Sequence, residues 1–161
     1  MPTAPPTVKR IQVQGVSQMD RGRDAMQVRD VMIHAVDFIA AGKTVREAAR
    51  KMQRLGMTGL AVVANHEAIG MITERDIVLR VVAPGLDPGD TAVAAVMTQG
   101  LVVCHEEDSL DIAARMMERS HLCRLVVINR KGELSGIISI TTLAGQMTPN
   151  VSVRLLQAIL T

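Results

Sequence analysis

Aromatic side chains are almost absent from this sequence, which contains no Trp, no Tyr and a single Phe, Phe38. The hydrophobic core must therefore be built from Val, Ile, Leu, Ala and the 11 Met residues. A base or another flat ring would have to stack on aliphatic or Met side chains. Proteins that bind single-stranded nucleic acid usually stack the bases on aromatic rings, so the composition argues against this class.

Strong charge and long apolar runs are also missing. The 18 Lys and Arg residues are nearly balanced by 16 Asp and Glu residues, which gives a net charge of +2. This charge is too small to indicate a nucleic-acid or membrane surface as partner. No apolar run approaches the length of a membrane span, and residues 1–15 lack the apolar segment of a signal peptide. We therefore expect a cytoplasmic protein.

Cysteine is scarce, and the residues that usually carry catalysis do not cluster. Cys104 and Cys123 are the two cysteines, and with four scattered His residues they show no zinc spacing. We expect both thiols to be reduced, and the adjacent pair Cys104-His105 to be structural. No Ser/His/Asp or Cys/His arrangement stands out, and Asp76 has no partner carboxylate at a suitable spacing. The sequence thus predicts no metal site, no catalytic cofactor and no enzymatic activity.

The length of 161 residues suits one compact domain or two small ones, and the chain divides into two similar halves. An offset of 65 residues aligns Asp30-Val31-Met32 with Ala95-Val96-Met97, and it is kept through the first helix and the next strand. After one inserted residue, an offset of 66 aligns Gly70–Thr73 with Gly136–Ser139. Matching caps, helix faces, strands and turns indicate a tandem repeat.

Each half has the pattern of a β-α-β-β-α unit. In the first half we expect an apolar strand at 36–40, a helix at 45–55 that begins with the capping box Thr44/Glu47, strands at 60–64 and 68–73, and a helix at 74–82. We divide the chain into a flexible arm at 1–27 with an optional short strand at 11–16, repeats at 28–90 and 91–145, and a helical tail at 146–161. Because one unit is too small to bury its own sheet well, we expect the two to pack together.

The corner between the strand at 68–73 and the following helix collects groups that bind anions and hydroxyls. Thr73 ends the strand, and Asp76 follows in the first helical turn. Backbone N–H groups at a helix N-terminus favour phosphate, and a carboxylate can accept hydrogen bonds from two sugar hydroxyls. A plainer interpretation fits the spacing too, with Thr73 as an ordinary cap and Asp76 as an ordinary first-turn acid. On spacing alone the plainer interpretation is the simpler one.

The motifs of both halves together resemble a pair of cystathionine-β-synthase (CBS) domains of the stand-alone type, also called a Bateman module. The resemblance covers Val28 to Ala144 and is carried by Asp-Val-Met at 30–32, Leu-Ala-Val-Val at 60–63 and Gly-Met-Ile-Thr-Glu-Arg-Asp at 70–76. It implies an α/β (α+β) fold in which two repeats pack through their sheets with pseudo-twofold symmetry. It also implies two clefts between the repeats, which adenine nucleotides or related adenosyl compounds occupy in this family.

The resemblance also assigns residues to these clefts. The family motif Gly-x-x-Thr/Ser-x-x-Asp, which contacts ribose and phosphate, corresponds to Gly70, Thr73 and Asp76, and a cleft usually adds the first strand and pre-strand loop of the other repeat. Arg124 suits a phosphate ligand because its guanidinium is permanently charged and forked. The nucleotide-binding residues we predict are Gly70, Met71, Thr73, Arg75, Asp76, Gly100, Leu101, Val102, Leu122, Cys123 and Arg124.

The second cleft departs from the family motif. Thr142 stands where the Asp is expected, Gly59 matches Arg124, and Asp37 matches Val102. These three losses fall on one cleft, whereas the Asp and the Arg fall on the other, and this division favours the ligand interpretation of Asp76. To the second, degenerate cleft we assign Ala35, Asp37, Thr58, Gly59, Ser139 and Thr142.

The sequence therefore predicts a regulatory module that binds AMP, ADP, ATP or S-adenosylmethionine in one cleft and transmits binding to a dimer partner or a target protein. Homodimerisation is expected because the helices carry small and apolar residues on both faces. The alternative is a constitutive interaction module whose clefts bind nothing. Nucleic-acid binding through the basic residues at 9–23 is the weakest option, and the identity of the target does not follow from the sequence.

Overall fold

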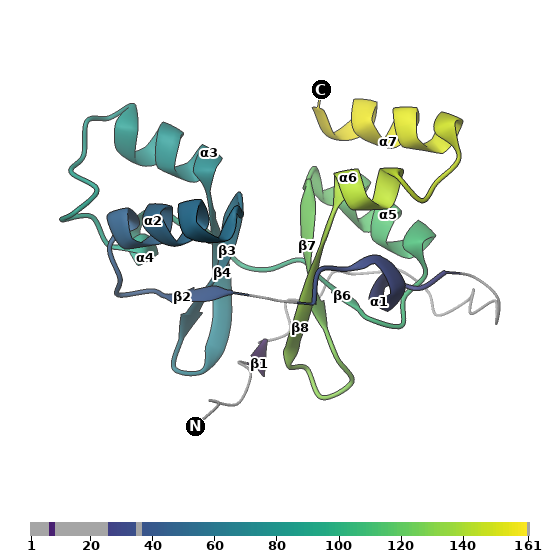
Figure 1. Ribbon diagram of the computed structural model, residues 1–161, viewed down its shortest axis with the longest axis horizontal. Coiled ribbons are helices and arrows are strands. Elements are labelled where there is room, and N and C mark those ends of the chain that lie inside the picture. Colours follow the sequence, from purple (N-terminus) through teal and green to yellow (C-terminus); the bar gives the residue numbers. More distant parts are fainter. Residues whose placement is uncertain (1–6, 9–25, 35–36, 161) are drawn as a thin grey trace. The chain divides into compact units, whose positions relative to one another are not determined.

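The computed structural model describes residues 7–8, 26–34 and 37–160, which form two compact units (Figure 1). Of these residues, unit 1 contains 7–8 and 37–101, and unit 2 contains 26–34 and 102–160. Each unit has one small sheet with helices, and the predicted α+β fold of two β-α-β-β-α repeats is confirmed. The packing of one repeat on the other stays a prediction. Most of the predicted arm, including its optional strand, lies outside the described residues.

Unit 1 is built around a sheet with the strand order β1-β4-β3-β2, and β5 pairs with β4. Its elements are β1 (Thr7–Val8), β2 (Phe38–Ala40), α2 (Val45–Leu55), β3 (Gly59–Ala64), β4 (Glu67–Thr73), α3 (Glu74–Ile77), the π-helix η1 (Val78–Val82), α4 (Val93–Val96) and β5 (Thr98–Gln99). Strand β3 runs parallel to β2 and antiparallel to β4.

Helix α2 begins and ends where its sequence predicts. The Thr44 hydroxyl accepts from the Glu47 amide at 3.2 Å, and the Glu47 carboxylate accepts from the Thr44 amide at 2.9 Å. Gly56 closes the helix with a φ of +64°. The apolar face of α2 (Val45, Ala48 and Met52) packs with Leu60, Val62 and Ile72 of the sheet in the core of unit 1. Full burial of one such Val, Leu or Ile contributes about 1.5–3 kcal/mol.

Unit 2 repeats this arrangement with a three-stranded sheet in the order β6-β7-β8. Its elements are α1 (Val28–Val31), β6 (Val103–His105), α5 (Leu110–Ser120), β7 (Arg124–Ile128), β8 (Leu134–Ser139), α6 (Ile140–Ala144) and α7 (Pro149–Leu160). The helix predicted in the tail is α7, which contacts α5 and α6 and buries Leu155 in the core of unit 2.

The segment that precedes the first strand of each repeat packs with the other repeat. Val28 of α1 is fully buried in the core of unit 2, and Ile33 forms an antiparallel bridge with Ile137 of β8. Conversely, α4 belongs to unit 1, where the Val93 amide donates to the Lys43 carbonyl at 2.8 Å. The compact units therefore differ from the sequence repeats at 28–90 and 91–145, whose boundaries stay a prediction.

The helix predicted at 74–82 changes its winding half-way. The first turn, α3, is α-helical, but the next turn, η1, is a π-helix. Its wider winding shows in the Ala83 amide, which donates to the Val78 carbonyl, and in the Leu86 amide, which donates to the Val81 carbonyl, both at 2.9 Å. A π-helical turn is rare and often marks a functional site. None of the helices in the described part of the chain has the length and apolar character that a membrane span requires.

Candidate functional site

The strand-to-helix corner of unit 1 is a closed network around the Asp76 carboxylate. Thr73 caps α3, because its hydroxyl accepts from the Asp76 amide at 3.2 Å. In return, the Thr73 amide and the Thr73 hydroxyl both donate to Oδ2 of Asp76 at 2.8 Å. Asp76 is 8% exposed, and among the residues that the structure describes no other charged residue is buried. Thr73 is thus confirmed as the cap of α3, and the capping box accounts for one of the two carboxylate oxygens, while the ligand role of Asp76 stays a prediction.

The other oxygen of Asp76 faces partners that the sequence analysis did not identify. Oδ1 accepts from the Thr98 hydroxyl at 3.1 Å and lies 3.4 Å from Nη1 of Arg80. The same Nη1 donates to the carbonyl oxygens of Val96 and Met97, each at 2.9 Å. These contacts compensate the burial of the charge. The i,i+4 spacing of Asp76 and Arg80 was a usable signal for one partner, but Thr98 lies 22 residues away from Asp76.

Gly70 has a structural role in the same corner. A Cβ atom at this position would lie 2.3 Å from the carbonyl oxygen of Thr98 and 3.3 Å from the Met97 sulfur. Gly136, its counterpart in repeat 2, is crowded in the same way, with Met32 Sδ at 2.6 Å and the Ile33 carbonyl oxygen at 3.0 Å. Both glycines therefore allow the close approach of a segment that belongs to the other sequence repeat.

The other predicted residues of unit 1 surround the network. Met71 is half-buried and pairs with Thr98 across β4 and β5, while Arg75 is exposed. Gly100 has a φ of +81°, and its amide donates to the Ile69 carbonyl at 3.0 Å. Leu101 is buried and is the last residue of unit 1. The structure thus brings Gly70, Met71, Thr73, Asp76 and Gly100 together within one unit.

The remaining predicted residues belong to unit 2. Val102, Leu122 and Cys123 are half-buried and pack against the core of that unit. Arg124 begins β7 and pairs with Ser139, and the Ile140 amide donates to the Cys123 carbonyl at 2.8 Å. Because these residues and the Asp76 network lie in different units, a common cleft between them stays a prediction.

Two of the residues assigned to the second cleft, Ser139 and Thr142, form an uncharged counterpart of the corner in unit 2. Ser139 caps α6, and its hydroxyl lies 2.9 Å from the Thr142 hydroxyl and 2.8 Å from the Thr141 hydroxyl. Asp37 is engaged in an ion pair with Lys51 at 2.9 Å. In unit 1, the Thr58 carbonyl accepts from the Glu74 amide at 3.1 Å, and Gly59 pairs with Thr73. Ala35 lies outside the described residues.

The cysteines and the possible metal ligands of the described residues do not form a second site. Burial, and then the charge of Asp108, raise the pKa of the Cys104 thiol, which stays protonated. In the described residues, no three His, Cys, Asp or Glu side chains are grouped as metal ligands.

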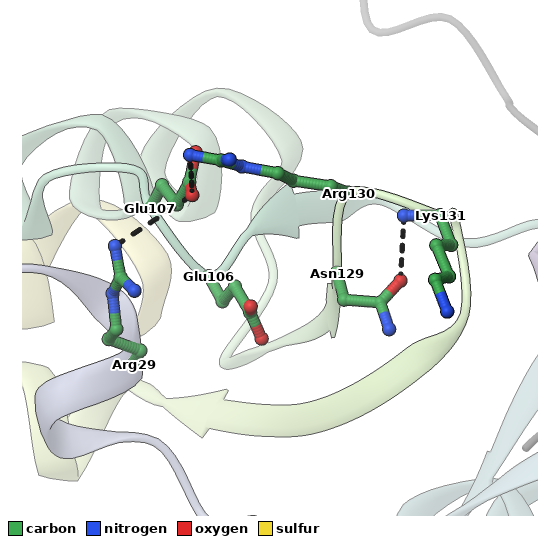
Figure 2. A pocket seen from close by; sticks show the side chains of 6 residues that line it. All are labelled: Arg29, Glu106, Glu107, Asn129, Arg130 and Lys131. Carbon is green, nitrogen blue, oxygen red and sulfur yellow. Dashed lines mark hydrogen bonds and ion pairs between the residues drawn. The ribbon is translucent and has the colours of Figure 1, made fainter.

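The pocket in Figure 2 has a volume of about 410 Å³ and is lined by charged and amide side chains: Arg29, Glu106, Glu107, Asn129, Arg130 and Lys131. Glu107 forms ion pairs with Arg130 at 2.5 Å and with Arg29 at 3.8 Å, and it raises the pKa of Arg130. None of the predicted site residues lines this pocket. Among the charged side chains that line the pocket, Glu107 is paired with both Arg29 and Arg130.

Comparison with known proteins places this geometry in a family. A sequence profile described as the CBS domain matches residues 28–83 and 93–148, once for each repeat. The chain belongs to the CBS domain family. Its CBS pair is 34% identical over 125 residues to the CBS domain-containing protein YhcV of Bacillus subtilis, which covers 78% of this chain and 88% of YhcV. Several other curated relatives are longer, and the match spans half of their length or less.

Two solved structures of CBS proteins resemble the pair. The hexameric CBS-CP12 protein from bloom-forming cyanobacteria is 31% identical, with a TM-score of 0.71, and the match covers 78% of this chain and 74% of that one. The CBS domain pair of protein MJ0100 is 20% identical, with a TM-score of 0.67, and covers 75% of this chain and 94% of that one. It was solved in complex with 5′-methylthioadenosine and S-adenosylmethionine. At this identity the likeness to MJ0100 shows the fold alone.

Proposed function

We propose that this CBS pair is a non-catalytic regulatory module that binds an adenine nucleotide (AMP, ADP or ATP) or S-adenosylmethionine at Asp76. Binding is then transmitted to a dimer partner or a target protein. The observation that carries the proposal is the buried Asp76 carboxylate, fixed by Thr73 in one repeat and replaced by Thr142 in the other. The adenosyl ligands of the MJ0100 pair support the ligand class.

The chemistry of Asp76 suits a ribose. An ionised carboxylate only accepts hydrogen bonds, and its two oxygens offer about four acceptor positions. Thr73 uses Oδ2 twice, so a hydroxyl of the ligand would approach Oδ1. Arg124, with Leu122 and Cys123 beside it, is proposed as the opposite wall, where a forked guanidinium suits a phosphate or carboxylate of the ligand.

Repeat 2 offers no equivalent carboxylate. Its corner holds the hydroxyls of Ser139, Thr141 and Thr142, which can accept hydrogen bonds but carry no charge. We therefore propose one competent site per chain. A titration that gives two equal, tight sites per chain would contradict this asymmetry.

The experiment is isothermal titration of AMP, ADP, ATP and S-adenosylmethionine into the wild-type chain and into Asp76→Asn. The substitution keeps the shape of the side chain but removes the charge, so we expect a loss of affinity of at least about tenfold, the range of a hydrogen bond to a charged group. Asp111→Asn is the matched control, because Asp111 is an exposed first-turn acid of α5. Absence of binding for all four compounds, or equal affinities of Asp76→Asn and Asp111→Asn for the ligand, would refute the proposal.

A constitutive interaction module remains the second candidate, and one observation favours it. The π-helix η1 exposes three apolar side chains, Val78 and Leu79 at 54% each and Val82 at 65%. Such a surface fits a protein partner, and a second copy of this chain is the partner we propose. A thermal melt separates the two functions, because a ligand that binds the folded protein raises the midpoint by mass action. An unchanged midpoint with all four compounds would favour the second candidate. The cytoplasmic location stays a prediction.

A further inference from the structure

Arg80 connects the proposed ligand site to the segment through which the chain leaves unit 1. We propose that Arg80 is a positioning residue of the Asp76 site, and that Arg80, Asp76 and Thr98 form a clasp that an adenosyl ligand opens. This inference rests on the proposed function and extends it, since it describes how binding at Asp76 is passed along the chain.

Arg80 fastens the end of α4 to the helix that carries Asp76. Its Nη1 donates to the Val96 and Met97 carbonyl oxygens at 2.9 Å each, and the same atom lies 3.4 Å from Oδ1 of Asp76. The last carbonyl groups of a helix have no partner within the helix, and an Arg side chain can satisfy them. Arg80 lies within the π-helix η1, whose wide turn is a local departure from α-helical winding.

Thr98 supplies the second half of the clasp. Its hydroxyl donates to Oδ1 of Asp76 at 3.1 Å, while its backbone pairs with Met71 of β4. Because Thr73 already occupies Oδ2 through two donors at 2.8 Å, Oδ1 is the oxygen that a ribose hydroxyl can reach. The ligand hydroxyl and the Thr98 hydroxyl therefore compete for the same acceptor.

The competition has a direction along the chain. Residues 96–99 are held by Arg80, by Thr98 and by the short pairing of β5 with β4, and Gly100 adds one bond to the Ile69 carbonyl. The chain then passes from Leu101 of unit 1 to Val102 of unit 2. A ligand that removes the Thr98 bond weakens the anchoring of this connecting segment. The fraction of molecules in which residues 96–99 are released from their anchors therefore rises.

Repeat 2 has no such clasp. The offsets of the repeat match Asp76 with Thr142, Arg80 with Gln146 and Thr98 with Ile33, so neither the carboxylate nor its two donors is present. The clasp is therefore limited to the repeat that kept the Asp. The proposed ligand site and the clasp thus occur together, at the same carboxylate.

The test combines binding and hydrogen exchange on the full chain, with AMP and S-adenosylmethionine as probes. Thr98→Val removes the competing hydroxyl, so we expect the affinity of this variant for the ligand to be about tenfold higher than that of the wild type. Thr98→Ser keeps a hydroxyl and should bind with the wild-type affinity. If the Thr98 hydroxyl instead made a direct contact with the ligand, its removal would lower the affinity of the protein for the ligand. Weaker or unchanged binding by Thr98→Val overturns the proposal.

Hydrogen exchange of the amides at 97–100 tests the clasp without ligand. Arg80→Met should raise their exchange rates by at least about tenfold, while Gln146→Met, the matched change in repeat 2, should not. Ligand should raise the same rates in the wild type and leave them unchanged in Thr98→Val, where the hydrogen bond that the ligand displaces is already absent. Equal exchange in Arg80→Met and Gln146→Met overturns the clasp. If AMP, ADP, ATP and S-adenosylmethionine all fail to bind the wild type, the proposed function and the coupling fall together, while the exchange of the ligand-free chain still decides whether the clasp exists.

Discussion

Replacing Gly70 by Ala tests the role that the structure gives to the first residue of the motif. The added methyl group would lie 2.3 Å from the Thr98 carbonyl oxygen, a backbone atom that belongs to β5. Because β5 cannot yield as a side-chain end can, the strand must shift away from β4. The shift breaks the pairing of Gly70 with Gln99 and disturbs the Thr98 contact with Asp76.

The expected cost of Gly70→Ala follows from these contacts. Overpacking of a well-filled site costs about 1–3 kcal/mol, and a clash with backbone belongs at the upper end of that range. For a chain of this size, about 3 kcal/mol lowers the melting temperature by roughly 6–12 °C. Gly136→Ala should cost less, since its nearest neighbour at 2.6 Å is the Met32 thioether, which can change rotamer.

Gly42→Ala is the control for this series, because a Cβ there meets nothing within 4 Å and its φ is not positive. Denaturant unfolding at neutral pH and a thermal melt of all three variants measure the differences. If Gly70→Ala and Gly42→Ala melt within about 2 °C of each other, the close approach of β5 to β4 is not a constraint, and Gly70 must be explained by its ligand alone.

Three further predictions concern a thiol, a carboxylate and a surface. Cys123, which is half-buried, should react with Ellman's reagent in the folded chain and be protected by bound ligand, whereas Cys104, whose pKa is raised by burial, should react only after unfolding; equal reaction rates would contradict this. The Thr44 amide and then Lys43 lower the pKa of Glu47, so its stabilising contribution is present at neutral pH and is lost as the pH falls through that lowered pKa. The urea midpoints of wild type and Glu47→Gln should therefore differ more at pH 7 than at about pH 3, and an equal difference at both would remove the assigned role. Val82→Lys should shift the chain to a smaller species in analytical ultracentrifugation if η1 forms the contact between copies, and an unchanged mass would exclude that surface.

Local signals were sufficient to predict most elements. The capping box of Thr44 and Glu47, the apolar run of β3 and the tail helix α7 are each determined by neighbours in the sequence, and each was confirmed. The π-helix η1 was not predicted, because its apolar positions fit an α-helix equally well. Its winding is distinguished by backbone hydrogen bonds and not by residue type.

The candidate site was only partly visible in the sequence for a similar reason. Thr73 and Asp76 are three residues apart, so their mutual hydrogen bonds follow from the spacing. Thr98 reaches Asp76 only because β5 folds back on β4, and a contact of this kind has no local pattern. The same fold-back explains Gly70, whose place in a ligand-binding motif concealed its steric role.

The packing of α1 in unit 2 and of α4 in unit 1 has a consequence for how the chain can be divided. Unit 2 is assembled from residues on both sides of unit 1 in the sequence, so no single cut in the backbone releases an intact unit. Cleavage after residue 90 would take Val93 and Val96 from the core of one half and leave Val28 of the other half on the wrong fragment. A gene that encoded either sequence repeat by itself would therefore yield a chain with an open core. The two repeats therefore depend on each other, because the hydrophobic core of each is completed by residues at the beginning of the other.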